Sequence, residues 1–323
     1  GEWVNGNKHK VWTWWDEQGQ KVSQTEWGDG VKHGIESFLH RNGETKERFV
    51  YSNGMVHGAY SSWYDNGTQK TAGQFVDGEK SGVWIQWFLT GDKKFERSYG
   101  DGQWLTWHRT GEKESEGPVK DGREDGDWTY WNENGAKIGE GQWREGTKHG
   151  HWRQWYGSGV PKSYGAFVDG LEHGHWIQWL PDGEKKREGE WVEGKEHGKW
   201  ISWYDNGNFR YEYGYKHGKW HGIRRFYFEN GQVQEERNYK DGKEDGKWIQ
   251  YNKNGQIENE VNYKDGRKYD GKWTDYYRNG QIKRERNYKN GELDGKWTRY
   301  NESGQISLEG NYKGGEPNGK WTE

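Results

Sequence analysis

The stretch GKWTDYYRNGQIKRERNYKNGELD, residues 271–294, is followed directly by GKWTRYNESGQISLEGNYKGGEPN, residues 295–318. Both stretches have 24 residues, open with Gly-Lys-Trp-Thr and carry Asn-Tyr-Lys at the same place. With these two, the copies begin at residues 10, 34, 58, 82, 102, 126, 150, 174, 198, 222, 246, 271 and 295, with half-copies at 1–9 and 319–323. The spacing is 24 residues except for 20 after residue 82 and 25 after residue 246. A fixed period of this length is typical of repeat proteins and predicts one elongated array over residues 1–323.

The composition predicts a folded chain whose apolar burial comes from aromatic rings. Of 323 residues only 28% are hydrophobic and 31% are charged, which is typical of disorder, but the chain has 25 Trp, 21 Tyr and only 4 Pro. The net charge of −3 and the absence of a basic stripe argue against nucleic acid as a partner. The longest apolar run, residues 83–89, is too short to span a bilayer.

Aromatic residues recur at three positions of each copy, and we call these columns the first, second and third ladders. They lie two, five and seventeen residues after the start of a copy. The second ladder is predicted to form the core, because a chain so poor in Leu, Ile and Val needs rings there. Its predicted core members are Trp15, Trp63, Trp87, Trp107, Trp131, Trp155, Trp179, Trp203, Tyr227, Tyr251, Tyr276 and Tyr300.

Two glycine columns predict that each copy is a β-hairpin. Asn-Gly pairs stand between segments rich in Trp, Tyr, Ile and Thr and predict two-residue type I′ turns. The turn glycines of this column include Gly67, Gly135, Gly207, Gly255 and Gly280. Asp-Gly or Asn-Gly at the second column predicts another tight turn. The fold class is therefore all-β: stacked hairpins forming an antiparallel meander or solenoid with aromatic ladders.

The sequence does not decide which face of the sheet each ladder occupies. The first and second ladders are three residues apart, so either both faces carry rings or a bulge brings the ladders together. A further glycine precedes the third ladder by two residues and is expected to leave room for a neighbouring ring to cover the strand. It occurs in six copies, at Gly73, Gly117, Gly141, Gly165, Gly189 and Gly310.

Histidines close several copies and are better explained by turns than by metal binding. The column holds His33, His57, His149, His173, His197 and His221, and other copies have Ser, Asp or Asn there. These residue types tolerate positive φ and each precedes a glycine, whereas equivalent positions two strands apart lie roughly 10 Å from each other. No metal site and no cofactor is therefore predicted. Nucleotide-binding and hydrolase motifs are also absent, so we expect no enzyme.

The repeat resembles a known family. The segments WYDNGTQKTAGQFVDGEKSG (63–82) and WVEGKEHGKWISWYDNG (191–207) are similar to the MORN repeat (membrane occupation and recognition nexus), and most similar to the variant in bacterial YwqK-type proteins that carry an antitoxin label. The resemblance covers the whole chain and implies an elongated hairpin array. It also implies scaffolding, protein contact or lipid association.

Two classes of function follow as hypotheses. The first is a non-enzymatic structural scaffold that assembles head to tail with itself, because GEWVNGNKH at 1–9 resembles the second half of a copy and GKWTE at 319–323 the beginning of one. Its contact residues would be Trp3, Val4, Lys320, Trp321 and Thr322, and we expect an extracellular or cell-surface location, with the cytoplasm as the alternative. The second is a binding module for a glycan or, antitoxin-like, for a protein partner. A site for one compact partner is expected to interrupt the repeat, which favours the scaffold.

Overall fold

The computed structural model describes residues 1–268 and 270–323, which fall into two compact units, Gly1–Gly159 and Val160–Glu323. The first unit contains β1 (Glu2–Val4), β2 (Asn7–Trp15), β3 (Lys21–Gly28), β4 (Val31–Leu39), β5 (Thr45–Ser52), β6 (Met55–Val56), β7 (Gly58–Trp63), β8 (Gln69–Val76), β9 (Glu79–Trp87), β10 (Lys93–Tyr99), β11 (Gly102–Trp107), β12 (Lys113–Lys120), β13 (Arg123–Glu124), β14 (Gly126–Trp131), β15 (Lys137–Arg144) and β16 (Thr147–Trp155). The second contains β17 (Pro161–Val168), β18 (Leu171–Trp179), β19 (Lys185–Val192), β20 (Lys195–Trp203), β21 (Phe209–Lys216), β22 (Lys219–Trp220), β23 (Gly222–Tyr227), β24 (Val233–Lys240), β25 (Lys243–Tyr251), β26 (Ile257–Lys264), β27 (Arg267–Lys268), β28 (Gly271–Tyr276), β29 (Ile282–Lys289), β30 (Glu292–Tyr300), β31 (Ile306–Lys313) and β32 (Glu316–Thr322).

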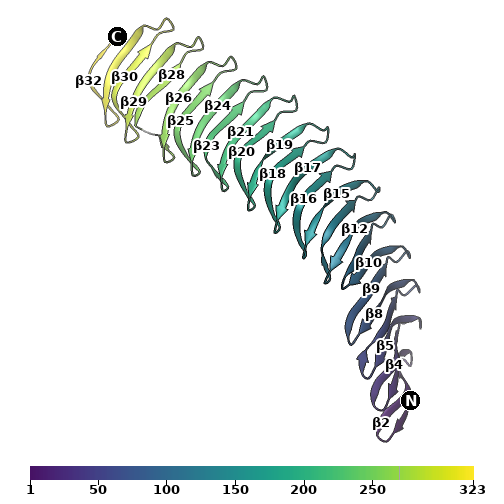
Figure 1. Ribbon diagram of the computed structural model, residues 1–323. Helices are drawn as coiled ribbons and strands as arrows, with labels where there is room; N and C mark the ends of the chain where they lie inside the picture. The colour runs from purple at the N-terminus through teal and green to yellow at the C-terminus, as the bar shows by residue number, and fades with distance from the viewer. Residues whose placement is uncertain (269) are drawn as a thin grey trace. The chain divides into compact units, whose positions relative to one another are not determined.

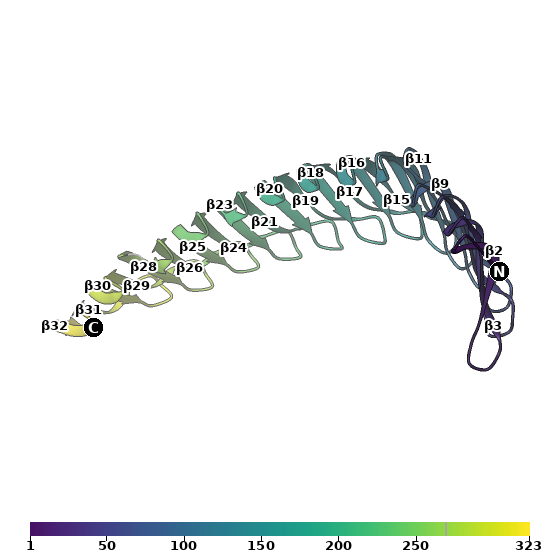
Figure 2. The ribbon, with the colours of Figure 1, turned by 90° about the horizontal axis from the view of Figure 1, so that it is seen from below.

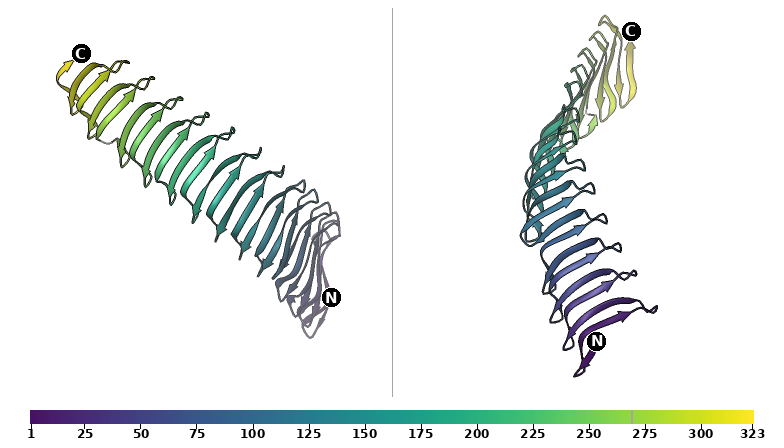
Figure 3. Two further views of the ribbon diagram at one scale, coloured as in Figure 1. Left: turned by 45° about the horizontal axis from the view of Figure 1, so that its top comes forward. Right: turned by 90° about the vertical axis from the view of Figure 1, so that its right-hand side faces the viewer.

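Within each unit the hairpins lie side by side in a single-layered antiparallel sheet (Figure 1). The view from below and the two further views show no element covering either face of the described strands (Figure 2, Figure 3). The predicted all-β hairpin repeat is thus confirmed, whereas a single array over the whole length stays a prediction. Because a single layer has no opposing sheet, its burial must come from side chains of neighbouring copies.

The strand register places the first and third ladders on the same face. In β14 and β15, Gly126 pairs with Trp143 and Trp128 with Gly141. Side chains alternate along a strand, so Trp128 and Trp143 share a face, and Trp131 at the end of β14 points to the other one. Both faces therefore carry rings, which answers the question that the spacing left open.

The six glycines confirm their predicted role. A Cβ atom on Gly141 would lie 2.2 Å from the Trp152 ring, and one on Gly189 would lie 2.2 Å from Trp200. The first-ladder ring of the following copy thus rests on the backbone at the glycine. It also makes an edge contact with the third-ladder ring, and the centroids of Trp143 and Trp152 lie 5.6 Å apart. First-ladder rings are the most buried in the molecule, with Trp152 only 5% exposed.

An indole hydrogen bond accompanies this packing. Trp152 Nε1 donates to the carbonyl of Gln142, the residue after the glycine, at 3.1 Å, and Trp200 Nε1 donates to Glu190 at 3.0 Å. Where Val261 stands in place of the glycine, the indole nitrogen of Trp273 is buried without a partner. Glycine therefore provides room for the ring but does not by itself determine the hydrogen bond, because Trp104 donates to Ser98 at 2.8 Å without a glycine and Trp321 lacks a partner although it rests on Gly310.

The turns differ from the prediction in one respect. In the Asn-Gly loop at 64–68, Gly67 has a φ of 81° while Asn66 keeps a negative φ, so the type I′ prediction is wrong there. Tyr64 N–H donates to the Thr68 carbonyl and Gly67 N–H to the Tyr64 carbonyl, which makes a three-residue loop with a type I turn and a left-handed glycine. The Asn66 side chain explains the choice, since its Oδ1 accepts the N–H of Thr68.

The Asp-Gly turns are the ones with type I′ geometry. Asp241 and Gly242 have φ values of 51° and 88° and join Lys240 to Lys243 as a two-residue turn. The prediction that the histidine column itself adopts positive φ is wrong. At His197 the positive φ falls on the following Gly198, and the imidazole Nδ1 accepts the N–H of His217 at 3.4 Å in the equivalent turn of the next copy, His217-Gly218.

One first-ladder position carries a carboxylate. Glu36 is 6% exposed and accepts hydrogen bonds from Thr25 Oγ1 at 2.8 Å and Lys32 Nζ at 2.7 Å. Burial alone would raise the pKa of Glu36, but the hydrogen bonds from Lys32, Thr25 and Tyr51 lower it below its usual value. A buried, paired carboxylate thus replaces a ring between β3 and β4.

Because folding lowers the pKa of Glu36, we expect the folded protein to lose stability in acid. A group whose pKa is lowered by folding stabilises the fold above its unfolded pKa of about 4.5 and loses that contribution as pH falls through the folded pKa. Between pH 6 and pH 3, the free energy of unfolding should therefore fall less in Glu36→Gln than in the wild type. Urea unfolding followed by fluorescence measures this. The exposed Glu44→Gln is the control, and a Glu36→Gln curve parallel to wild type contradicts the prediction.

Candidate interaction surface

The second ladder lies on the face opposite the first and is half-buried. Its predicted core position does not hold for Trp15, whose side chain is 60% exposed. The other members, Trp63, Trp87, Trp107, Trp131, Trp155, Trp179, Trp203, Tyr227, Tyr251, Tyr276 and Tyr300, are of intermediate exposure. The deepest burial belongs instead to the first ladder, because only that column rests on the glycine backbone of the neighbouring copy.

In several copies a lysine ammonium group lies over the second-ladder ring. Lys113 Nζ lies 5.7 Å from the Trp131 ring centroid and 2.5 Å from Glu116, and Lys185 lies 5.3 Å from the Trp203 ring. The same arrangement recurs at Lys93 with Trp107 and at Lys137 with Trp155. A ring whose face is taken by an ammonium group of the same chain has little surface left for stacking on a sugar. This argues against the second ladder of these copies as a glycan platform.

Later copies of the second unit use a different arrangement. Tyr227 replaces Trp, and its hydroxyl donates to Glu212 Oε2 at 2.8 Å, while Lys199 approaches the same carboxylate at 2.6 Å. Burial and the hydrogen bond to Glu212 raise the pKa of Tyr227 to about 12. Phe209 takes the place of the covering lysine and packs 5.8 Å from Tyr227. The second face therefore holds its charges in internal ion pairs.

The edge formed by the Asn-Gly loops carries a column that the sequence analysis missed, one residue after the second ladder. Its aromatic side chains join neighbouring loops: Tyr64 Oη donates to the Trp87 carbonyl at 3.0 Å, and Tyr204 Oη to the Tyr227 carbonyl at 2.8 Å. His40 and His108 make the equivalent contact through Nε2. The repeated occurrence of Tyr, Phe and His at this position of the copy is the sequence feature that could have predicted these contacts.

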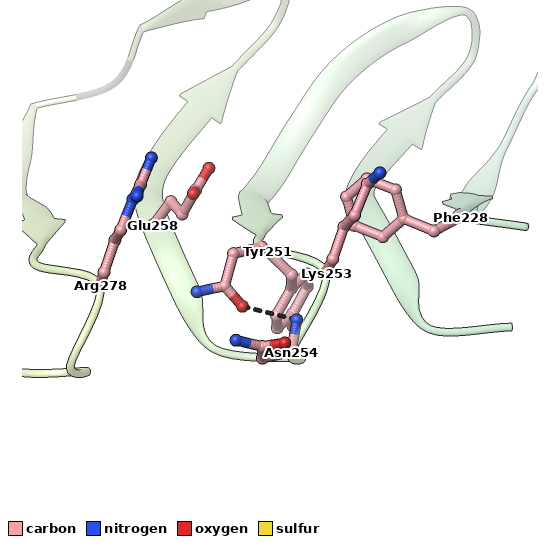
Figure 4. Close-up of a pocket in the computed structure, with 7 residues that line it drawn as sticks. Phe228, Tyr251, Lys253, Asn254, Glu258 and Arg278 are labelled. Atoms are coloured by element: carbon pink, nitrogen blue, oxygen red, sulfur yellow. Dashed lines mark hydrogen bonds between the residues drawn. The ribbon is translucent and has the colours of Figure 1, made fainter. Parts of the chain in front are cut away.

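Grooves recur at equivalent positions between adjacent loops of the Asn-Gly column, in which residues 90–91 and 110–111 are Thr-Gly. Three of them, two in the first unit and one in the second, enclose about 260, 290 and 400 Å³. Each groove is lined by a second-ladder residue, by the residue that follows it in the chain, and by the equivalent of that following residue in the preceding copy. Charged residues stand on the rim. The linings include Trp63, Tyr64, His40, Lys46 and Lys70 in the smallest, Trp107, His108, Phe88, Lys94 and Arg109 in the next, and Tyr251, Asn252, Phe228, Lys253 and Arg278 in the largest (Figure 4).

The predicted turn glycines and chain-end residues are placed as follows. Gly67, Gly135, Gly207, Gly255 and Gly280 all have positive φ, between 75° and 83°. Trp3 is 62% exposed and packs edge-on against Trp12, while Trp321 rests on Gly310. Val4, Lys320 and Thr322 are exposed.

Metal and membrane features are absent from the part of the chain that the structure describes. It holds no group of three or more His, Asp or Glu side chains that could bind a metal ion. Residues 1–268 and 270–323 also include no helix with the length and apolar character needed to cross a bilayer.

Comparison with known proteins finds the MORN repeat variant in the second unit. Five consecutive segments match its family model: 196–217, 220–241, 244–265, 269–290 and 293–313. No curated protein matches the chain. Among solved structures, TcdB2-TccC3 is similar at 10% identity over 95% of this chain with a TM-score of 0.18. A Photorhabdus luminescens Tc holotoxin pore is similar at 11% identity over 96%, also with a TM-score of 0.18. The chain spans only 18% and 20% of those two chains.

Proposed function

We propose that this protein is a non-enzymatic interaction scaffold that holds an extended polypeptide along the edge formed by its Asn-Gly loops. The observation that carries the proposal is the recurrence of one groove at the same repeat positions in both units. Repeat arrays commonly bind extended partners across equivalent surfaces of successive copies. The five MORN-variant segments agree with a repeat-based scaffold.

The geometry of the edge limits the kind of partner. Equivalent points in successive copies lie two strands apart, roughly 10 Å. A partner in the polyproline II conformation rises about 3.1 Å per residue with three residues per turn, so every third side chain would face the edge and enter a groove. Rim cations such as Lys94 and Arg109, which lie over the Phe88 ring at 5.9 and 5.8 Å, suit acidic residues of the partner.

A peptide-display selection against the purified chain tests this function. We expect selected peptides to show preferences that recur at every third position and to lose affinity for the double variant Lys94→Glu/Arg109→Glu. The matched control is Lys120→Glu/Arg123→Glu, which changes the charge equally at the Asp-Gly edge of the same unit. Loss of binding in the control variant but not in the groove variant would contradict the proposal.

Head-to-tail assembly through the strands that contain Trp3 and Trp321, and a location outside the cell, stay predictions. Light scattering over a range of concentrations tests the assembly, since a polymer grows with concentration while a monomeric scaffold keeps one mass. An antitoxin-like role would be the special case in which the extended partner belongs to a toxin.

A further inference from the structure

The largest of the three grooves differs chemically from the other two. It lies between the loops that follow β23, β25 and β28 and encloses about 400 Å³ (Figure 4). Phe228 and Tyr251 contribute rings, and Lys253, Asn254 and Arg278 contribute polar groups. These groups come from three successive copies, so the site exists only where the copies stack.

The groove lacks one ring that the smaller grooves have. In the smaller grooves the column after the second ladder carries Tyr64 or His108, and these grooves enclose about 260 and 290 Å³. Here Asn252 stands at that position, and the volume reaches 400 Å³. Its amide is used within its own loop, where Oδ1 accepts the N–H groups of Asn254 and Gln256.

The polar groups around the opening are available for a ligand. Among the described residues, the side chains of Lys253, Asn254, Glu258 and Arg278 have no ion-pair or hydrogen-bond partner. Glu258 differs in this from Lys70, the residue at the same position in the smallest groove. The Lys70 ammonium group lies over the Tyr64 ring at 5.6 Å, whereas Glu258 has no such contact. An unengaged carboxylate, amide, ammonium and guanidinium thus surround two aromatic rings.

From this combination we infer that the groove at Asn252 binds a neutral pyranose saccharide. Aromatic side chains pack on the apolar face of a pyranose, and interspersed donors and acceptors match its hydroxyl groups. The mixed charges favour neither a polyanion nor a polycation. Unlike the Trp131 ring, which lies under Lys113, the Tyr251 ring has no lysine of residues 1–268 and 270–323 over it. The inference goes beyond the peptide scaffold, because it concerns one cavity rather than the row of grooves.

The test is titration calorimetry of the full chain with cellotriose, triacetylchitotriose and maltotriose as probes. We expect at least one probe to bind, and Asn252→Tyr to weaken that binding by about tenfold or more by refilling the groove. The variant should fold, because Tyr204 and Tyr277 occupy the same position in this unit and bond to the next copy. Glu258→Ala, at a side chain without contacts, should weaken binding independently.

The control is Asn132→Tyr, an identical substitution at the equivalent loop position of the first unit, which should leave binding unchanged. Lys94→Glu/Arg109→Glu should also retain saccharide binding, which separates this test from that of the peptide scaffold. The inference is overturned if no probe binds the wild type at millimolar concentration. It is equally overturned if both Asn252→Tyr and Glu258→Ala bind as tightly as the wild type.

Discussion

Gly141→Ala is expected to lower the free energy of unfolding of the first unit by about 2 to 3 kcal/mol, the effect of overfilling a packed site. A Cβ atom there would lie 2.2 Å from the buried Trp152 ring, and this ring is held by its hydrogen bond to the Gln142 carbonyl. The ring must move away from the strand, so both its packing and its hydrogen bond weaken.

Gly139→Ala is the matched control for this substitution. Gly139 lies two residues earlier on the same strand and face, but a Cβ atom there would meet Tyr130 at an ordinary 3.5 Å. The two variants can be compared by urea unfolding together with hydrogen exchange of amides in β15 and β16. Equal stability of the two variants would show that the ring does not depend on the bare backbone.

Trp200→Ala should have the largest effect of any single substitution in the second unit, about 3 to 5 kcal/mol. The Trp200 side chain is 4% exposed, covers Gly189 and meets the Trp191 ring at 5.4 Å. Its removal opens a cavity between two copies that a single-layered sheet has no other side chains to fill.

Trp203→Ala, three residues away on β20, removes the same side chain from the half-buried second ladder and should cost less. Because long repeat arrays can unfold in parts, local hydrogen exchange in β19 to β21 is the appropriate measurement alongside the overall transition. A larger loss in Trp203→Ala would mean that the second ladder, not the first, forms the core.

The comparison of the two ladders shows where sequence reasoning succeeded and failed. Both columns are rich in Trp at a fixed spacing, and the sequence analysis assigned the core to the second ladder. Burial follows instead from what lies beneath the ring. Gly189 leaves the backbone bare under Trp200, whereas Lys185 crosses the face of Trp203. The glycine column is visible in the sequence, but the sequence does not show which ladder lies over it.

The candidate site was predictable only in part. The positions of the Asn-Gly loops follow from glycine, since Gly67 and Gly255 need positive φ. The grooves between the loops were missed, because they depend on side chains 23 or 24 residues apart in neighbouring copies, such as Tyr64 beside Trp87. The opening at Asn252 is visible in the sequence as one missing ring, but its meaning requires the loops to stand next to each other.

The all-β class, the turn glycines and the six glycines that accommodate rings could be predicted from the sequence alone. These features are local, because a glycine column and a period of 24 residues record backbone conformation and stacking directly. Only the three-dimensional structure showed which ladder is buried, that the turns of the second glycine column rather than the first are type I′, and where the grooves open. The turn types depend on side chains within a loop, such as Asn66 Oδ1 accepting the N–H of Thr68. The buried ladder and the grooves depend on contacts between copies: rings against bare backbone, and rings against the next loop's carbonyl. A strand's neighbours determine those contacts, and one copy read along the chain does not contain them.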